Sequence, residues 1–158
     1  MSRFLALLFL VLLALPASAQ DEESAVSAVL DSVHRLASEA DFDGYFALYT
    51  EDAIFMGTDA MERWTIADFK QYARPAFDRG TGWTYTMTER YVFVSEDEKT
   101  AWFDERLQNA AFGECRGTGA LVKQDGVWKV AQYNLTVPIP NDLLRDFASQ
   151  IKDHHAGN

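Results

Sequence analysis

The order of the hydrophobic patterns predicts an α+β fold in one domain. In the first half of the chain, apolar residues recur at the spacing of helices, whereas residues 83–137 read as four consecutive strands. An Asp125-Gly126 pair between the last two of these strands is a strong signal of a two-residue hairpin turn. Helices followed by a strand meander favour helices packed on a single antiparallel sheet.

The first nineteen residues have the pattern of a secretory signal peptide. Arg3 gives a positive start, residues 4–15 form an apolar run, and small residues at 16–19 predict cleavage after Ala19. The apolar run is shorter than the roughly 20 residues that a membrane span requires. We therefore expect export to the periplasm or the medium, no membrane association after cleavage, and a single mature domain over residues 20–158.

The helical patterns come next. Residues 22–40 are predicted to form a helix, because Val26, Leu30, Val33 and Ala37 share one stripe. A short helix over 42–49 and a short strand over 53–56 follow. Thr65 and Asp68 resemble a capping box that opens a third helix, which Pro75 is expected to bend or end near residues 73–74.

The four strands of the meander are predicted over residues 83–95, 100–109, 114–124 and 127–137. Two prolines end the last strand, and Asn141 is expected to cap a final helix. Leu144, Phe147 and Ile151 line that helix at helical spacing.

Charge and cysteine content exclude several classes of function. The chain carries a net charge of −10, and removal of Arg3 leaves 13 basic and 24 acidic side chains, about −11. This balance argues against nucleic acid and anionic membranes as partners. Cys115 is the single cysteine, so no disulfide within the chain is possible. No motif indicates a cofactor, and no spacing matches a zinc or calcium site.

The order of these elements, together with the sequence DGVWKV at 125–130, resembles the nuclear transport factor 2-like superfamily, most closely its SnoaL-like branch. The resemblance covers about residues 22–137. It implies a cone-shaped, strongly curved antiparallel sheet that encloses a pocket with the N-terminal helices. The superfamily includes ketosteroid isomerase, polyketide cyclases, limonene epoxide hydrolase, dehydratases and binding modules, so the fold leaves the activity open.

The hairpin register predicts where a pocket lies. A two-residue turn pairs Leu121 with Val130, Gly119 with Gln132, and Gly117 with Asn134, so the two amides would stand above a floor of glycine. SnoaL-like relatives often carry His near these positions, and an amide is no general base near neutral pH. An alternative is that the glycines mark bulges. The predicted ligand-pocket residues are Tyr45, Trp64, Trp83, Cys115, Trp128, Gln132 and Asn134.

Three neighbours on one strand are the catalytic candidates: Asp104, Glu105 and Arg106. Asp104 and Arg106 share a face and resemble the Asp and Arg of limonene epoxide hydrolase, but no second carboxylate is evident on the neighbouring strand, so an ion pair on the outer sheet face is the favoured explanation. Glu105 faces the other way. If it stood alone among aromatics in the cone, its pKa would be raised and it could act as a base.

Three functions remain open from the sequence. The first is a domain that binds a small, largely apolar molecule in the cone. The second is an isomerase, cyclase, dehydratase or hydrolase that uses a pocket carboxylate. The third is a structural module that forms a homodimer through the sheet face, where Tyr133 is expected.

The sequence places His34 at the edge of its helix stripe, on the surface. Arg74 and Arg116 could bind an anionic group.

Overall fold

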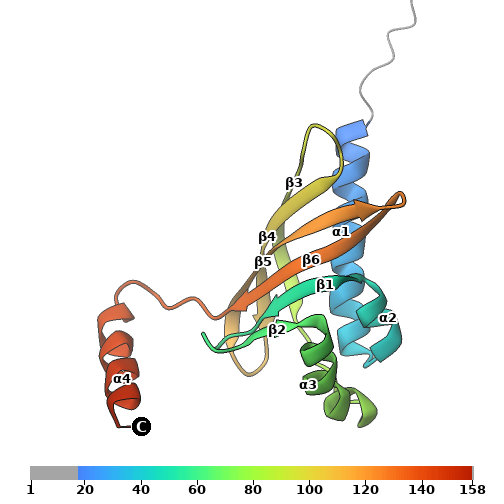
Figure 1. Ribbon diagram of the computed structural model, residues 1–158. Coiled ribbons are helices and arrows are strands. Elements are labelled where there is room, and N and C mark those ends of the chain that lie inside the picture. Colours follow the sequence, from blue (N-terminus) through green and yellow to red (C-terminus); the bar gives the residue numbers. More distant parts are fainter. Residues whose placement is uncertain (1–17, 158) are drawn as a thin grey trace, which may run out of the picture.

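The computed structural model describes residues 18–157, so all but the end of the predicted signal peptide lies outside it. Helices and strands follow one another in a single α+β domain (Figure 1). None of the described helices has the length and hydropathy to span a lipid bilayer. The helices are α1 (Ser18–Ser38), α2 (Phe42–Ala47), α3 (Ile66–Asp78) and α4 (Leu144–Ala156). The strands are β1 (Tyr49–Met56), β2 (Arg63–Thr65), β3 (Thr86–Val94), β4 (Thr100–Asn109), β5 (Gly113–Gln124) and β6 (Val127–Thr136).

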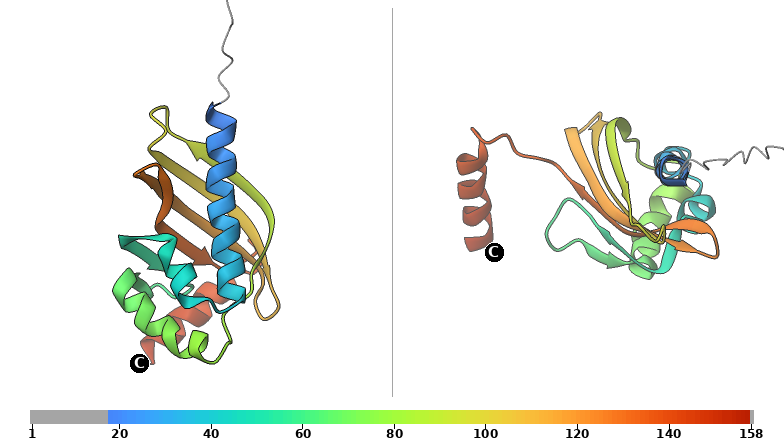
Figure 2. Two further views of the ribbon diagram at one scale, coloured as in Figure 1. Left: turned by 90° about the vertical axis from the view of Figure 1, so that its right-hand side faces the viewer. Right: turned by 90° about the horizontal axis from the view of Figure 1, so that it is seen from above.

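The six strands form one curved, open sheet in the order β2-β1-β6-β5-β4-β3. All neighbouring pairs are antiparallel except β1 and β6, which run parallel and depart from the antiparallel sheet that the sequence predicts. Helices α1, α2 and α3 lie on one side of the sheet, whereas α4 stands apart on the opposite side (Figures 1 and 2). We call the helix-covered side the inner face and the opposite side the outer face.

The core lies between α1 and the inner face. The predicted stripe of α1 is confirmed, since Val26, Leu30, Val33 and Ala37 are all buried. Strand β4 buries every second residue, which is the period of a strand covered on one side. Ala101, Phe103, Glu105 and Leu107 therefore face inward. A carboxylate thus occupies a position that the pattern assigns to the core.

Two helix boundaries differ from the expectation. Helix α3 does not end at residues 73–74 but continues through Pro75 to Asp78. Ala73 and Phe77 are both buried, so packing on either side of the proline offsets the lost backbone hydrogen bond. Helix α4 begins at Leu144, and its cap position, Leu143, makes no side-chain hydrogen bond. The predicted cap, Asn141, lies before the helix starts.

The β5–β6 hairpin confirms the turn and corrects the register beyond it. Asp125 and Gly126 have φ values of 50° and 80°, the positive angles that a type I′ turn requires. Leu121 pairs with Val130 as predicted, but the next pair is Ala120 with Gln132. Ala131 is therefore an extra residue, a β-bulge that shifts every later partner by one position.

Candidate functional site

The sheet register separates the three catalytic candidates. Glu105 points inward and is 1% exposed, whereas Asp104 and Arg106 lie on the outer face. Arg106 makes its ion pairs with Glu114, at 3.0 Å, and with Glu89, at 3.6 Å. The structure therefore does not bring Asp104, Glu105 and Arg106 together in one site. The carboxylate that lies within the cone is Glu105.

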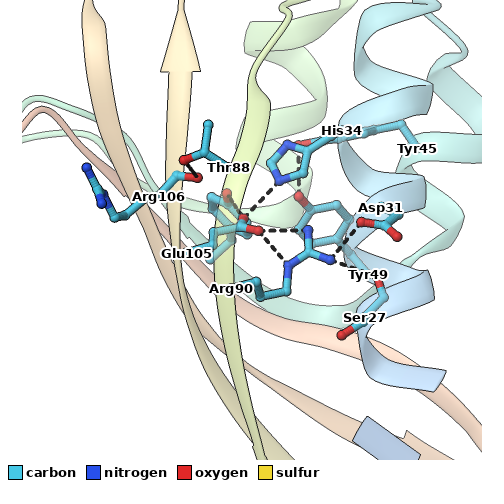
Figure 3. Close-up of polar contacts among 10 residues, drawn as sticks. Ser27, Asp31, His34, Tyr45, Tyr49, Thr88, Arg90, Glu105 and Arg106 are labelled. Carbon is cyan, nitrogen blue, oxygen red and sulfur yellow. Dashed lines mark hydrogen bonds and ion pairs between the residues drawn. The ribbon is translucent and has the colours of Figure 1, made fainter. Parts of the chain in front are cut away.

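Glu105 is held by donors from α1, β3 and β6. Figure 3 labels two of them, His34 of α1 and Arg90 of β3. Its Oε1 accepts hydrogen bonds from His34 Nε2, at 2.9 Å, and from the Tyr133 hydroxyl, at 2.7 Å. Its Oε2 accepts one from Arg90 Nε, at 2.8 Å, and Arg90 Nη2 lies at the same distance as an ion-pair contact. Both oxygens of the buried carboxylate are thus satisfied, as a charge in the interior requires.

Arg90 connects this carboxylate to the surface. Its Nη1 donates to Asp31 Oδ1, at 2.7 Å, and to the backbone oxygen of Ser27, at 3.0 Å. The Arg90 side chain is almost fully buried, whereas Asp31 is exposed. Two residues of α1 therefore anchor the guanidinium, which fixes the position of Glu105 from the side opposite His34.

Gly117 makes room for the network. It lies directly opposite Glu105 on β5. A methyl group there would lie 2.3 Å from the Tyr133 hydroxyl oxygen and 2.8 Å from Glu105 Oε1. Both distances are shorter than any ordinary contact. A side chain at this position would push the tyrosine and the carboxylate apart.

The charge state of Glu105 differs from the expectation for a lone carboxylate. Burial raises its pKa, but the hydrogen bond and charge of His34, the charge of Arg90 and the Tyr133 hydrogen bond outweigh burial, so the net pKa is lowered. Burial and the neighbouring Glu105 raise the pKa of Tyr133 well above its usual value. Glu105 is therefore an ionised acceptor, and the expected raised pKa is wrong because three donors surround it.

An aromatic cavity of about 240 Å³ opens between the sheet and α3. Several of its rings lie nearly parallel: Phe55 and Phe69 are 3.9 Å apart with an interplanar angle of 15°, and Trp64 and Tyr72 are 4.6 Å apart at 24°. Glu62 is the charged residue among the described lining, which contains no Lys or Arg. The remaining lining residues are Gly57, Thr58, Trp83, Tyr85, Phe112 and Leu135.

A second, smaller cavity of about 20 Å³ lies on the inner side of the first. The two share Phe55, Trp83, Tyr85 and Leu135 as walls. The small cavity is also lined by His34, Tyr45 and Tyr133, and it has space for about one water molecule. A path of aromatic side chains thus leads from the surface to the two residues that bind Glu105 Oε1.

The predicted pocket residues fall into two groups. Trp64 and Trp83 line the larger cavity, and Tyr45 and Trp83 line the smaller one. The other four lie outside both cavities as the structure describes them. Trp128 is buried and donates from Nε1 to Glu22, at 2.7 Å. Cys115 is buried too, and burial followed by the charge of Glu114 raises the pKa of its thiol, which disfavours the reactive thiolate.

Gln132 and Asn134 are not where the hairpin register places them. The bulge at Ala131 pairs Gly119 with Tyr133 and Gly117 with Leu135, so the two amides lie on the outer face. Gln132 is exposed and Asn134 is half-buried. Tyr133, expected on the outer face, is instead buried in the core. One extra residue reverses the facing of every side chain after it.

His34, expected at the surface edge of its helix stripe, belongs to the Glu105 network instead. Its spacing in the sequence does indicate the buried side of α1, because His34 lies four residues after Leu30 and three before Ala37, both of which are buried. Its side chain is 13% exposed. The two arginines considered for an anionic ligand lie elsewhere: Arg74 is stacked over Phe42 at 3.4 Å, and Arg116 faces outward on β5. Within residues 18–157, no three metal-ligating side chains gather closely enough to hold an ion.

Comparison with known proteins gives a family and a fold. Residues 26–140 match the model of the SnoaL-like domain. The chain resembles a nuclear transport factor 2-like protein of unknown function from Pseudomonas putida (TM-score 0.65, 14% identity, 78% of this chain and 91% of that one). It also resembles a putative scytalone dehydratase from Novosphingobium aromaticivorans (0.60, 16%, 76% and 86%) and a ketosteroid isomerase-like protein from Erwinia carotovora (0.57, 20%, 76% and 98%). No curated protein sequence matches.

Proposed function

We propose that this chain, which belongs to the SnoaL-like domain family, binds a small, largely apolar molecule in its aromatic cavity. The observation that carries the proposal is the lining of the 240 Å³ cavity, in which aromatic rings predominate and lead inward to His34 and Tyr133. Ligand sites are typically apolar hollows with a few polar groups that fix the orientation of the ligand. Here His34 and Tyr133 are the polar groups at the inner end, and Glu62 lies in the lining of the larger cavity.

The lining narrows the class of ligand. Typical ligand pockets measure roughly 300–1,000 Å³, so a cavity of about 240 Å³ suits a molecule of one or two rings. The described lining offers Glu62 but no basic side chain, so a carboxylate or phosphate on the ligand would find no partner. The ligand is therefore uncharged or cationic within the cavity. A hydroxyl or carbonyl group at its inner end could reach His34.

Binding is tested by screening uncharged one-ring and two-ring compounds for thermal stabilisation. A ligand at 100 times its Kd should stabilise the protein by about 2.7 kcal/mol and raise Tm by roughly 5–10 °C. Trp64→Ala should abolish the shift, and Val127→Ala, which truncates an exposed apolar side chain outside the cavity, should leave it unchanged. Failure of the whole library to stabilise the protein would contradict the proposal.

The His34–Glu105 pair favours a second candidate function, proton transfer to or from the bound molecule. A carboxylate that accepts from one ring nitrogen orients the imidazole and stabilises its protonated form. With Nε2 held by Glu105, a small group that the ligand extends from the larger cavity into the inner one would exchange its proton with Nδ1 of His34. Histidine would then be the base, and Glu105 the residue that positions it, rather than the base that the sequence suggested.

Proton transfer is measured by nuclear magnetic resonance in D₂O. Carbonyl compounds that stabilise the protein should exchange the hydrogen next to the carbonyl group for deuterium faster with protein than in buffer. His34→Gln should abolish the acceleration while thermal stabilisation by the compound persists. If no bound carbonyl compound exchanges faster than in buffer, the domain binds without catalysing this step.

Export remains a proposal that rests on residues 1–19 alone. The protein recovered after expression in a secreting host should begin at Gln20. Mass spectrometry of the intact protein distinguishes that product from the full chain.

A further inference from the structure

Helix α4 carries an apolar stripe that nothing in its own chain covers. Leu144, Phe147 and Ile151 recur at helical spacing and are 43–49% exposed, and none of the residues of α4 is buried. Both views place the helix on the outer side of the sheet and clear of it (Figures 1 and 2). A helix this short is marginal in water without a packing surface. We therefore expect another surface to cover the apolar stripe of α4.

The segment before α4 keeps the helix away from its own domain. Strand β6 ends at Thr136, and Pro138 and Pro140 follow within four residues. Each proline fixes φ and disfavours helical backbone at the residue before it, so this segment is stiff and extended. The chain turns after Pro140, whose oxygen accepts from Leu143 N at 3.0 Å. After this turn, α4 lies clear of the core of its own domain (Figures 1 and 2).

The outer sheet face carries the matching surface. Tyr91, Phe93 and Trp102 stand on β3 and β4 and are 45–51% exposed. Phe93 and Trp102 are stacked, with ring centroids 5.7 Å apart, so they form one continuous patch. Isolated apolar residues are normal on a surface, but a contiguous aromatic patch marks an interaction site. We call these three residues the outer aromatic patch.

Charge favours a second copy as the partner. The chain as a whole has a net charge of −10, which keeps copies apart, but the two surfaces concerned are close to neutral. Helix α4 has Arg145 and Lys152 against Asp146 and Asp153. Around the outer aromatic patch, Glu89, Asp104 and Glu114 stand beside Arg106 and Arg116. A membrane fits less well, because interfacial helices are rich in basic residues.

The area available agrees with a stable dimer. Large aromatic side chains present about 150–250 Å², so half-exposed side chains of this size each offer roughly 100 Å². With the α4 stripe and the outer aromatic patch each covered in both copies, the twelve side chains bury on the order of 1,200 Å², at the lower end of the standard range for specific interfaces. One helix on one patch would bury about half of that.

We propose that two copies of this chain form a dimer in which each α4 packs its apolar stripe on the partner's outer aromatic patch. We call this mutual packing the α4 exchange. It is independent of ligand binding, because neither the α4 stripe nor the outer aromatic patch lines the aromatic cavity. It also explains why one chain has two uncovered apolar surfaces. In the dimer, each surface covers the other.

Light scattering after size exclusion tests the dimer and its cause. The protein should have twice the mass of one chain. Phe147→Asp should halve that mass, whereas Ser149→Asp, which adds the same charge to the opposite side of α4, should not. Phe147 is exposed in the single chain, so its replacement should not destabilise the monomer. The Tm of Phe147→Asp should therefore equal the Tm of the native protein diluted until it is monomeric. A monomeric native protein, or a Phe147→Asp variant that stays dimeric, overturns the proposal.

Disulfide trapping shows which sheet the helix reaches. Ile151→Cys and Phe93→Cys, placed in separate chains and mixed, should form a crosslinked heterodimer under mild oxidation. Ser149→Cys in place of Ile151→Cys should not. If the two cysteines in one chain crosslink within a monomer, or if the protein is monomeric and binds lipid vesicles through α4, the exchange between copies is wrong.

Discussion

The two faces of strand β4 hold charges of the same kind in opposite surroundings. On the inner face, Glu105 is surrounded by His34, Arg90 and Tyr133 with no access to water. On the outer face, Arg106 bridges Glu89 and Glu114, and all three side chains are about half exposed to solvent. Adjacent residues in sequence thus belong to two ion networks. Loss of one partner in the inner network leaves a charge buried and should lower the stability of the fold strongly. Loss of one partner in the outer network leaves a solvated charge and should cost little.

The largest expected effect comes from removing the inner carboxylate. Glu105→Ala leaves the buried Arg90 with the exposed Asp31 as its remaining anion and should lower the free energy of unfolding by about 3–5 kcal/mol. Urea unfolding followed by circular dichroism measures the loss. Arg106→Ala, one residue away on the outer face, should change the unfolding curve far less. Equal losses in the two variants would contradict the distinction between the faces.

A smaller effect is expected from filling the space that the inner network uses. Gly117→Ala places a methyl group against the Tyr133 hydroxyl and Glu105, and we expect a loss of about 1–3 kcal/mol from overpacking. Thr118→Ala, which truncates a side chain on the outer face of the same strand, serves as the outer-face control. The unfolding midpoints of the two variants check the difference, and a Gly117→Ala protein as stable as Thr118→Ala would show that the network tolerates expansion.

The smallest expected effect is a dependence on pH. The folded state lowers the pKa of Glu105, so its ionised form stabilises the protein fully above the unfolded-state pKa of about 4.3. This contribution is lost as pH falls from that value toward the folded-state pKa. Stability measured in urea between pH 6 and pH 3 should therefore fall more steeply in the native protein than in Glu105→Gln. Parallel curves would contradict an ionised Glu105.

Local patterns predicted most of the fold. The α1 stripe, the β4 boundaries and the Asp125-Gly126 turn depend on neighbours in sequence, and all three are confirmed. The site depends on long-range geometry instead. His34 and Glu105 are 71 residues apart, so no local pattern reports that they meet. The parallel pairing of β1 with β6 and the strand β2 likewise arise from tertiary packing.

The register of β6 shows a different limit. Nothing about Ala131 distinguishes it from an ordinary strand residue, and the bulge there follows from how β6 fits a curved sheet. Simple alternation from the turn therefore placed Gln132 and Asn134 inside and Tyr133 outside. The resemblance to a cone-shaped fold predicted a pocket at the sheet, but the identity of its polar residues depended on the register.

The bulge at Ala131 also makes the pairing of β6 a determinant of chemistry. If Ala131 paired regularly with Ala120, Trp128 and Val130 would stay in place, the phenol of Tyr133 would turn to solvent, and the amides of Gln132 and Asn134 would face the cone. Glu105 would then lack its tyrosine donor. Deletion of Ala131 would instead remove the extra residue itself and leave Tyr133 on the inner face. The same strand sequence can therefore give a phenol-and-carboxylate interior or an amide one, depending on whether the sheet accommodates Ala131 as a bulge.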